Sequence, residues 1–255
     1  MTQNPYESPE KSQTAKTATD GKSLSLWKIL AVIGVNVLLI ALILPSIRWA
    51  PDSRGRTKCM NNLKNITLAL ISYAERHNAF PPAYIVDADG YRLHSWRTLI
   101  LPYLDQQTLY ESIDLSKPWN DTANAKAFGT ELDVFICPEA KLSGGLTTYL
   151  GNAATDGCFT GERPRPVSEK TYPHHNTVLV VEVASSHAVH WMAPKDADES
   201  ILLNFGSGSK SAHIGVVGAG FVDGTVRILS VDLDSHVRRA LITATGSDEI
   251  SEKDF

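Results

Sequence analysis

The stretch CMNNLKNITLALISYAERH, residues 59–77, carries the pattern that decides the fold. Its apolar residues recur at alternating steps of three and four, which is the period of one face of an α-helix. This stripe consists of Leu63, Ile66, Leu70, Tyr73 and His77. Phe80-Pro81-Pro82 follows and ends the helix, because proline cannot continue the helical hydrogen bonds. The pattern predicts an amphipathic helix whose apolar face packs against a sheet.

The segments after this helix are mostly short apolar runs separated by Gly, Pro and Asp. Two short helices are expected at 95–104 and 106–113, a turn at 87–90, and a last helix at about 233–244. The expected strands are 134–137, 147–152, 177–184, 218–222 and 225–230. Short strands with such separators favour antiparallel pairing, and the regular strand–helix alternation of parallel folds is missing. The sequence therefore predicts an α+β fold in which the amphipathic helix packs on an antiparallel sheet.

Residues 24–47, LSLWKILAVIGVNVLLIALILPSI, are the most apolar part of the chain, and Lys28 is their only charge. A helix needs about 20 mostly apolar residues to cross a bilayer core of about 30 Å. Trp27 and Trp49 bracket the run, and indole rings favour the headgroup level. A cleaved signal peptide would be shorter and would end in small residues, and a core helix is seldom apolar all round. We therefore expect an N-terminal transmembrane helix with the lipid bilayer as its partner.

Five segments follow from these patterns. We expect a disordered N-terminal tail at 1–23, the transmembrane helix at 24–47, a linker at 48–58, an α+β domain at 59–246 and a C-terminal tail at 247–255. The linker is expected because Pro51 and Gly55 disfavour a continuous helix. A net charge of −4 and the absence of a long basic run argue against nucleic acid as a partner.

The stretch SAHIGVVGAGFVDGTVRIL, residues 211–229, predicts a β-hairpin. Asp223-Gly224 between two alternating apolar runs is typical of a two-residue type I′ turn. His213 precedes this pair with nine residues between them. It can serve the structure, by hydrogen-bonding the turn or its carboxylate, or it can serve catalysis. The structural role is favoured, since catalysis also needs a positioned partner and a pocket.

Other reactive residues form no recognisable motif. Cys59, Cys137 and Cys158 contain no C-x-x-C pair, which argues against zinc-knuckle and thioredoxin motifs. His187 and His190 are three residues apart, which directs them to opposite faces of a strand. GVVGAG at 215–220 lacks the glycine order of a nucleotide-binding loop. Spacing alone therefore predicts no catalytic, cofactor-binding or metal-binding residues, and no enzyme.

Several blocks of the chain, in order, resemble a large planctomycete-type family (domain of unknown function fifteen-fifty-nine). The spacing of His213, Asp223 and Gly224 is similar to the family's H-x9-DG motif. The other similar blocks are CMNNLKNITLALISYAERHNAFPPA (59–83), SWRTLILPYLDQQTLYESID (95–114), PWND (118–121), VFICPEA (134–140) and TTYLGNA (147–153). Further positions that match the family pattern are Glu182, Trp191, Pro194 and Asp196. The resemblance covers residues 24 to about 246, and NPYESP at 4–9 resembles a recurrent start of membrane proteins from such bacteria.

The resemblance implies a pilin-like or pseudopilin-like protein. It implies a single helix in the inner (cytoplasmic) membrane, an N-terminus in the cytoplasm and a C-terminal domain outside it. It also implies a disulfide between Cys59 and Cys137, for which three buried thiols are the alternative. The family has no established enzymatic activity, so the resemblance implies none, and other envelope or pilin-machinery proteins are the expected partners.

The chain departs from the pilin-type pattern at its N-terminus. Pilin-type leaders place Phe-Thr-Leu-Ile-Glu after the cleaved Gly, whereas Lys-Ser-Leu-Ser-Leu follows Gly21 here. Counting back from Pro45 places Lys28 where the family carries the Glu that guides assembly. We therefore expect that the N-terminus is kept and that the protein does not polymerise like a pilin.

Two functions remain at this point. The first is a membrane-anchored extracytoplasmic protein with a structural or interaction role and no enzymatic activity. The second is an extracytoplasmic ligand- or metal-binding module that uses the loops between residues 153 and 215. A cleft that gathers Glu182, His213 and Asp223 favours the second, and a packed hairpin in which His213 caps the turn favours the first.

Overall fold

The computed structural model describes residues 25–48, 51–167, 176–205, 212–246 and 250. The chain divides into two compact units, residues 1–50 and residues 51–255. The tail predicted at 1–23 lies outside the described residues, as does the tail predicted at 247–255 apart from residue 250.

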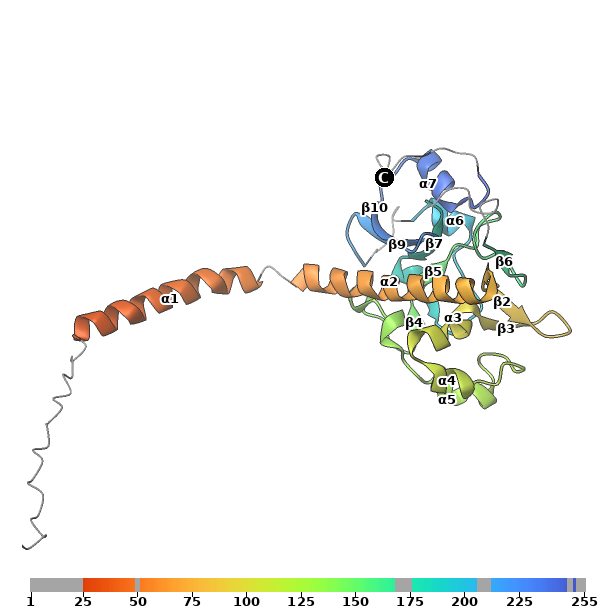
Figure 1. Cartoon of the computed structure of the whole chain (residues 1–255), viewed down its shortest axis with the longest axis horizontal. Coiled ribbons are helices and arrows are strands. Elements are labelled where there is room, and N and C mark those ends of the chain that lie inside the picture. Colours follow the sequence, from red (N-terminus) through yellow and green to blue (C-terminus); the bar gives the residue numbers. More distant parts are fainter. Residues whose placement is uncertain (1–24, 49–50, 168–175, 206–211, 247–249, 251–255) are drawn as a thin grey trace, which may run out of the picture. The chain divides into compact units, whose positions relative to one another are not determined.

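The first unit contains one helix, α1 (Leu26–Arg48) (Figure 1). From Leu26 to Ile40 its large apolar side chains are 43–76% exposed. Among the described residues, none of the helices has both the length and the apolarity that a membrane crossing requires. The transmembrane helix at 24–47 therefore stays a prediction.

The second unit begins with the long helix α2 (Pro51–His77). The prediction of a linker at 48–58 is wrong for residues 51–58, because these form the first turns of α2. Proline is tolerated in the first turn of a helix, where its missing N–H would have no intrahelical partner. Pro51 therefore starts the helix, although its presence suggested a break.

The buried face of α2 follows the predicted stripe. Leu63, Ile66 and Leu70 are fully buried, and Tyr73 is half-buried. His77 is exposed at the end of the helix and stacks on Tyr73 with ring centroids 4.1 Å apart. The amphipathic helix is thus confirmed, and only its last stripe position lies outside the core.

The sheet that α2 covers is antiparallel, with the strand order β10-β9-β7-β5. Its strands are β5 (Tyr149–Gly151), β7 (Val178–Glu182), β9 (Val216–Phe221) and β10 (Val226–Ser230). Close approach of the helix requires a residue without a side chain on β9. A Cβ atom at Gly220 would lie 2.0 Å from Oγ1 of Thr67 on α2. Gly220, the last glycine of the GVVGAG stretch, therefore serves helix–sheet packing.

The sheet separates two apolar clusters. Tyr149 belongs to the cluster that contains the buried face of α2. The next residue, Leu150, belongs to a second cluster with Leu202 and Leu241. Successive residues of a strand point to opposite faces, so the two clusters lie on opposite faces of the sheet. The second face is covered by α6 (Glu199–Leu203) and α7 (Ser235–Ile242).

Short elements complete the second unit (Figure 1). Three small antiparallel pairs are β1 (Ala79–Phe80) with β6 (Arg165–Pro166), β2 (Tyr84–Val86) with β3 (Arg92–Ser95), and β4 (Leu146–Thr147) with β8 (Val189–His190). The short helices are α3 (Trp96–Leu99), η1 (Leu101–Leu104), α4 (Gln107–Glu111), η2 (Thr122–Asn124), α5 (Ala125–Phe128), η3 (Asp133–Phe135), η4 (Pro138–Ala140) and η5 (Ser185–His187). The α+β class with antiparallel sheets is confirmed.

One predicted strand is wrong. Residues 134–137 were expected to extend, but Asp133–Phe135 forms the single helical turn η3. The turn is closed by hydrogen bonds from Phe135 N to Leu132 O and from Ile136 N to Asp133 O. A run of four apolar or sulfur-containing residues can be buried equally well in a strand or in a helical turn. The run therefore did not distinguish a strand from a turn.

Replacement of Leu63 by Ala tests the packing of α2. The side chain is fully buried, so its truncation is expected to lower the free energy of unfolding by about 2–5 kcal/mol. Leu68→Ala on the same helix is the matched control, because Leu68 is 44% exposed. Chemical denaturation of both variants measures the difference. Equal effects of the two substitutions would contradict the assigned buried face.

Candidate functional site

Four residues with metal-binding or redox-active side chains meet beneath α2. Cys59 lies on α2, Cys137 immediately precedes η4, Glu182 ends β7, and His213 lies just before β9. The antiparallel pairing of β7 with β9 brings the end of β7 to the start of β9, and therefore brings Glu182 near His213. All four side chains are buried.

The four side chains are in direct contact. Cys59 and Cys137 form a disulfide. Nε2 of His213 lies 3.4 Å from Oε2 of Glu182 and 3.8 Å from Sγ of Cys137. One donor atom from each of the four residues lies within 4.8 Å of every other. The structure thus joins the two cysteines that the family resemblance pairs, and it places a carboxylate and an imidazole beside them.

A fully buried tyrosine, Tyr149, lies beside this cluster. Tyr149 faces Glu182 across the β5–β7 pair, and its hydroxyl donates to the carbonyl of Cys59 at 3.2 Å. Burial raises the pKa of Tyr149 above its usual range, and the negative charge of Glu182 adds to this rise. Both carboxylate oxygens of Glu182 are buried and accept no hydrogen bond among the described residues. A buried carboxylate in this state is costly unless a positive charge compensates it.

Thiolates, an imidazole and a carboxylate are together the ligand types that proteins use for zinc. Sequence spacing predicted no metal-binding residues, whereas the structure gathers one such group within the described residues. The reason is that the four residues come from four separate segments, with no two of them within a short motif. In the disulfide form, the same group is a covalent link beside the 3.4 Å contact between Nε2 of His213 and Oε2 of Glu182.

The predicted role of His213 as a cap of the hairpin turn is wrong. The whole length of β9 separates His213 from the turn that contains Asp223 and Gly224. Oδ1 of Asp223 accepts instead from the backbone N–H and the hydroxyl of Thr225, at 2.8 and 2.7 Å. The cleft that would join Glu182, His213 and Asp223 does not form either, since only the first two are neighbours.

The hairpin itself is confirmed, but its turn differs from the prediction. Val226 pairs with Gly220, and Phe221 N–H donates to Thr225 O, which leaves a loop of Val222, Asp223 and Gly224. Only Gly224 of this loop has positive φ, at 81°. A three-residue loop with Gly in the left-handed region is the next most common hairpin connection after the two-residue turns. The side-chain hydrogen bonds of Asp223 hold the loop in this form.

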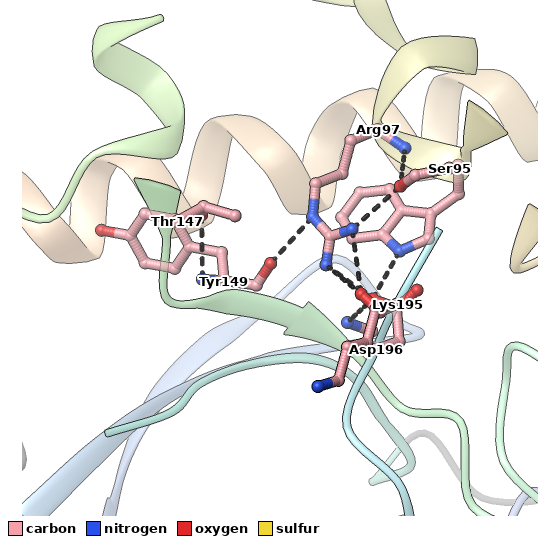
Figure 2. Close-up of polar contacts among 8 residues, drawn as sticks. Ser95, Arg97, Thr147, Tyr149, Lys195 and Asp196 are labelled. Atoms are coloured by element: carbon pink, nitrogen blue, oxygen red, sulfur yellow. Dashed lines mark hydrogen bonds and ion pairs between the residues drawn. The ribbon is translucent and has the colours of Figure 1, made fainter. Parts of the chain in front are cut away.

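Asp196 lies in a second buried polar cluster, centred on Arg97 (Figure 2). Oδ1 of Asp196 accepts from the Arg97 guanidinium at 2.6 Å, from Trp96 Nε1 at 2.9 Å and from Gly151 N at 2.7 Å. Figure 2 shows the Arg97 side chain also directed toward Ser95 and the Tyr149 carbonyl, to which it donates at 2.8 and 3.1 Å. The cluster therefore joins α3 to β5 and to the segment around Asp196.

This ion pair is almost completely removed from solvent, with 0% of the Arg97 and 3% of the Asp196 side chain exposed. Burial raises the pKa of Asp196, and the charge of Arg97 opposes that rise. A buried ion pair is costly to break, because one charge then remains without compensation. The arrangement fits a structural joint.

The other two residues of the family pattern also lie near these clusters. Trp191 is fully buried, and its Nε1 donates to Thr130 O at 2.9 Å while its ring stacks on Phe135. Pro194 lines a cavity of about 470 Å³ together with Lys195 and Asp196. The sequence pattern assigned no role to Arg97, Trp96 or Tyr149. These residues lie inside the blocks that resemble the family, but that position does not identify the residues with which they interact.

The fold and the buried clusters define an α+β domain with one long helix on an antiparallel sheet. Residues 54–180 match the model of a family described as protein of unknown function (DUF1559). Over this region the chain belongs to that family. The match includes Cys59, Arg97 and Cys137 and ends before Glu182, so the family assignment of residues 181–246 and of the N-terminal helix stays a prediction. No curated protein and no solved structure matches the chain.

Replacement of Asp196 by Asn tests the second cluster. The substitution keeps the shape but leaves the Arg97 charge buried without a partner, so the free energy of unfolding is expected to fall by about 3–5 kcal/mol. Asp133→Asn is the matched control, because 91% of the Asp133 side chain is exposed, and it should leave stability nearly unchanged. Denaturant titration of both variants measures their free energies of unfolding. A D196N protein as stable as the parent would contradict a structural joint at this site.

Proposed function

We propose that this protein is a membrane-anchored, pseudopilin-like protein of the cell envelope with a structural or interaction role and no enzymatic activity. In this proposal residues 24–47 cross the inner (cytoplasmic) membrane once. The N-terminus lies in the cytoplasm, and the domain that starts at α2 lies outside it. Its partners are the bilayer and other envelope proteins.

The exposed apolar surface of α1 is the observation that carries the proposal. All residues from Leu26 to Ile40 are exposed. Their side chains are apolar on all sides of the helix, and the exceptions are Lys28, Gly34 and Asn36. The Asn36 amide donates to Val32 O at 2.8 Å within the helix, which satisfies one of its hydrogens without water. A helix that is apolar all round is typical of a buried or membrane-spanning segment.

Two features of the second unit support the orientation and the pilin-like class. The Cys59–Cys137 disulfide suits an oxidising compartment, which the space outside the cytoplasm provides. A long helix on an antiparallel sheet is the arrangement that the pilin-like resemblance implies. Lys28 argues against pilin-type polymerisation, since a cation there would repel the amino terminus of a neighbouring subunit.

Fractionation of the full chain tests the anchor. The parent protein is expected in the membrane pellet after alkaline carbonate washing. Val35→Arg with Leu38→Arg should release it, because each Arg near the centre of a span disfavours insertion by about 2.5–3.5 kcal/mol. Tyr91→Arg is the control, since Tyr91 is 70% exposed in the second unit, and it should stay in the pellet.

The same preparation checks the orientation and the N-terminus. Protease added to sealed spheroplasts should digest the domain, and the intact mass should include residues 1–21. Release of the parent by carbonate, or protection of the domain from protease, would contradict the proposal. A chain that starts at Lys22 would contradict an unprocessed N-terminus.

A further inference from the structure

We propose that Cys59, Cys137, Glu182 and His213 form a zinc site when the Cys59–Cys137 disulfide is reduced. This inference does not rest on the proposed membrane anchor, since it concerns only side chains of the second unit. The site would hold one divalent ion through two thiolates, one imidazole nitrogen and one carboxylate oxygen.

The distances between the donor atoms support this assignment. A tetrahedral zinc ion with ligand nitrogen and oxygen at about 2.0–2.1 Å separates these two atoms by about 3.4 Å. Nε2 of His213 and Oε2 of Glu182 are 3.4 Å apart. A zinc-bound sulfur and nitrogen are separated by about 3.6 Å, and Cys137 Sγ lies 3.8 Å from His213 Nε2. The distances from His213 to Glu182 and to Cys137 are thus close to those of a tetrahedral site, and all four donor atoms lie within 4.8 Å of one another.

The two sulfur atoms must separate before the ion can bind. Zinc-bound sulfurs lie about 3.8 Å apart, so the covalent bond between Cys59 and Cys137 excludes the ion. The disulfide and the metal are therefore alternative links between α2 and the segment before η4. Both the disulfide and the metal connect α2 to the segment before η4. The metal would also connect them to β7 and to the segment before β9.

The state of Glu182 gives an independent reason to expect a ligand. Its side chain is 95% buried, and neither carboxylate oxygen accepts a hydrogen bond among the described residues. The carboxylate lies beside His213 and the cysteines, with one of its oxygens within 4.8 Å of the other three donor atoms. A divalent cation among these atoms would stabilise the buried negative charge, since buried charges are usually paired or bind metals.

Conversion of the disulfide form to the zinc form begins with reduction of the disulfide. A dithiol reductant gives two electrons and two protons to the Cys59–Cys137 bond and becomes a disulfide itself. Zn²⁺ then forms one bond to each sulfur and releases one proton from each thiol. Nε2 of neutral His213 and the Glu182 carboxylate supply the remaining two bonds. Thiolate, imidazole and carboxylate ligands in tetrahedral order favour zinc over magnesium or calcium, which prefer oxygen ligands.

A metal titration of the full chain in detergent tests the proposal. The chain is reduced with a phosphine, freed of metal with a chelator, and titrated with Co²⁺ and then Zn²⁺ under anaerobic conditions. We expect one Co²⁺ per chain with thiolate-to-cobalt charge-transfer absorption and tetrahedral d–d bands, both lost when Zn²⁺ is added. The oxidised chain should show neither signal. A reduced chain without these bands, or an oxidised chain that binds equally, overturns the proposal.

Variants locate the site. Glu182→Gln and His213→Gln should each weaken Co²⁺ binding by at least about tenfold, since even the loss of a residue that only supports a ligand has an effect of 10–100-fold. Cys59→Ser removes one of the two thiolates and should lower the thiolate-to-cobalt charge-transfer absorption. Cys158→Ser is the matched control, because Cys158 is buried elsewhere and donates to Val178 O. Retention of full affinity in both E182Q and H213Q, or its loss in C158S, overturns the assignment, with circular dichroism as the check that each variant is folded.

Discussion

The packing of α2 on the central sheet is the constraint on which the second unit depends. Thr67 of the helix approaches the sheet at Gly220 of β9, where any side chain would collide with it. Leu63 and Leu70 fill the apolar layer between them. Cys59 extends the same face and is bonded to Cys137, so from Cys59 onward the helix is held by its buried face and by a covalent link. The sheet then places Glu182 and Tyr149 under that link.

Two buried polar clusters share Tyr149 as a common neighbour. Its carbonyl accepts from Arg97, and its hydroxyl donates to the carbonyl of Cys59. One side of β5 therefore contacts both the Arg97–Asp196 ion pair and the region around the disulfide. Buried polar groups with complete hydrogen bonds restrict the ways in which a core can pack. In the Arg97 cluster the guanidinium and Oδ1 of Asp196 are hydrogen-bonded, whereas neither carboxylate oxygen of Glu182 accepts a hydrogen bond among the described residues.

The sequence was informative where the pattern is local. The stripe of Leu63, Ile66 and Leu70 predicted the buried face of α2, because helical period and burial coincide there. Asp223-Gly224 predicted a hairpin but not its loop length, since Gly in the left-handed region serves both turn types. The sites are not local. Cys59, Cys137, Glu182 and His213 are separated by at least 31 residues of sequence, so only the packing of α2 and the pairing of β7 with β9 bring them together. Arg97 and Asp196, 99 residues apart, could not be paired either.

The position of α2 on the sheet is tested most directly by the disulfide map of the full chain after metal has been chelated and the protein has been oxidised with glutathione disulfide. Peptide mapping without reduction should find Cys59 joined to Cys137 and Cys158 as a thiol, because only the first two meet where α2 contacts the segment before η4. A bond that involves Cys158, or three thiols in the oxidised protein, would contradict the position of α2 on the sheet.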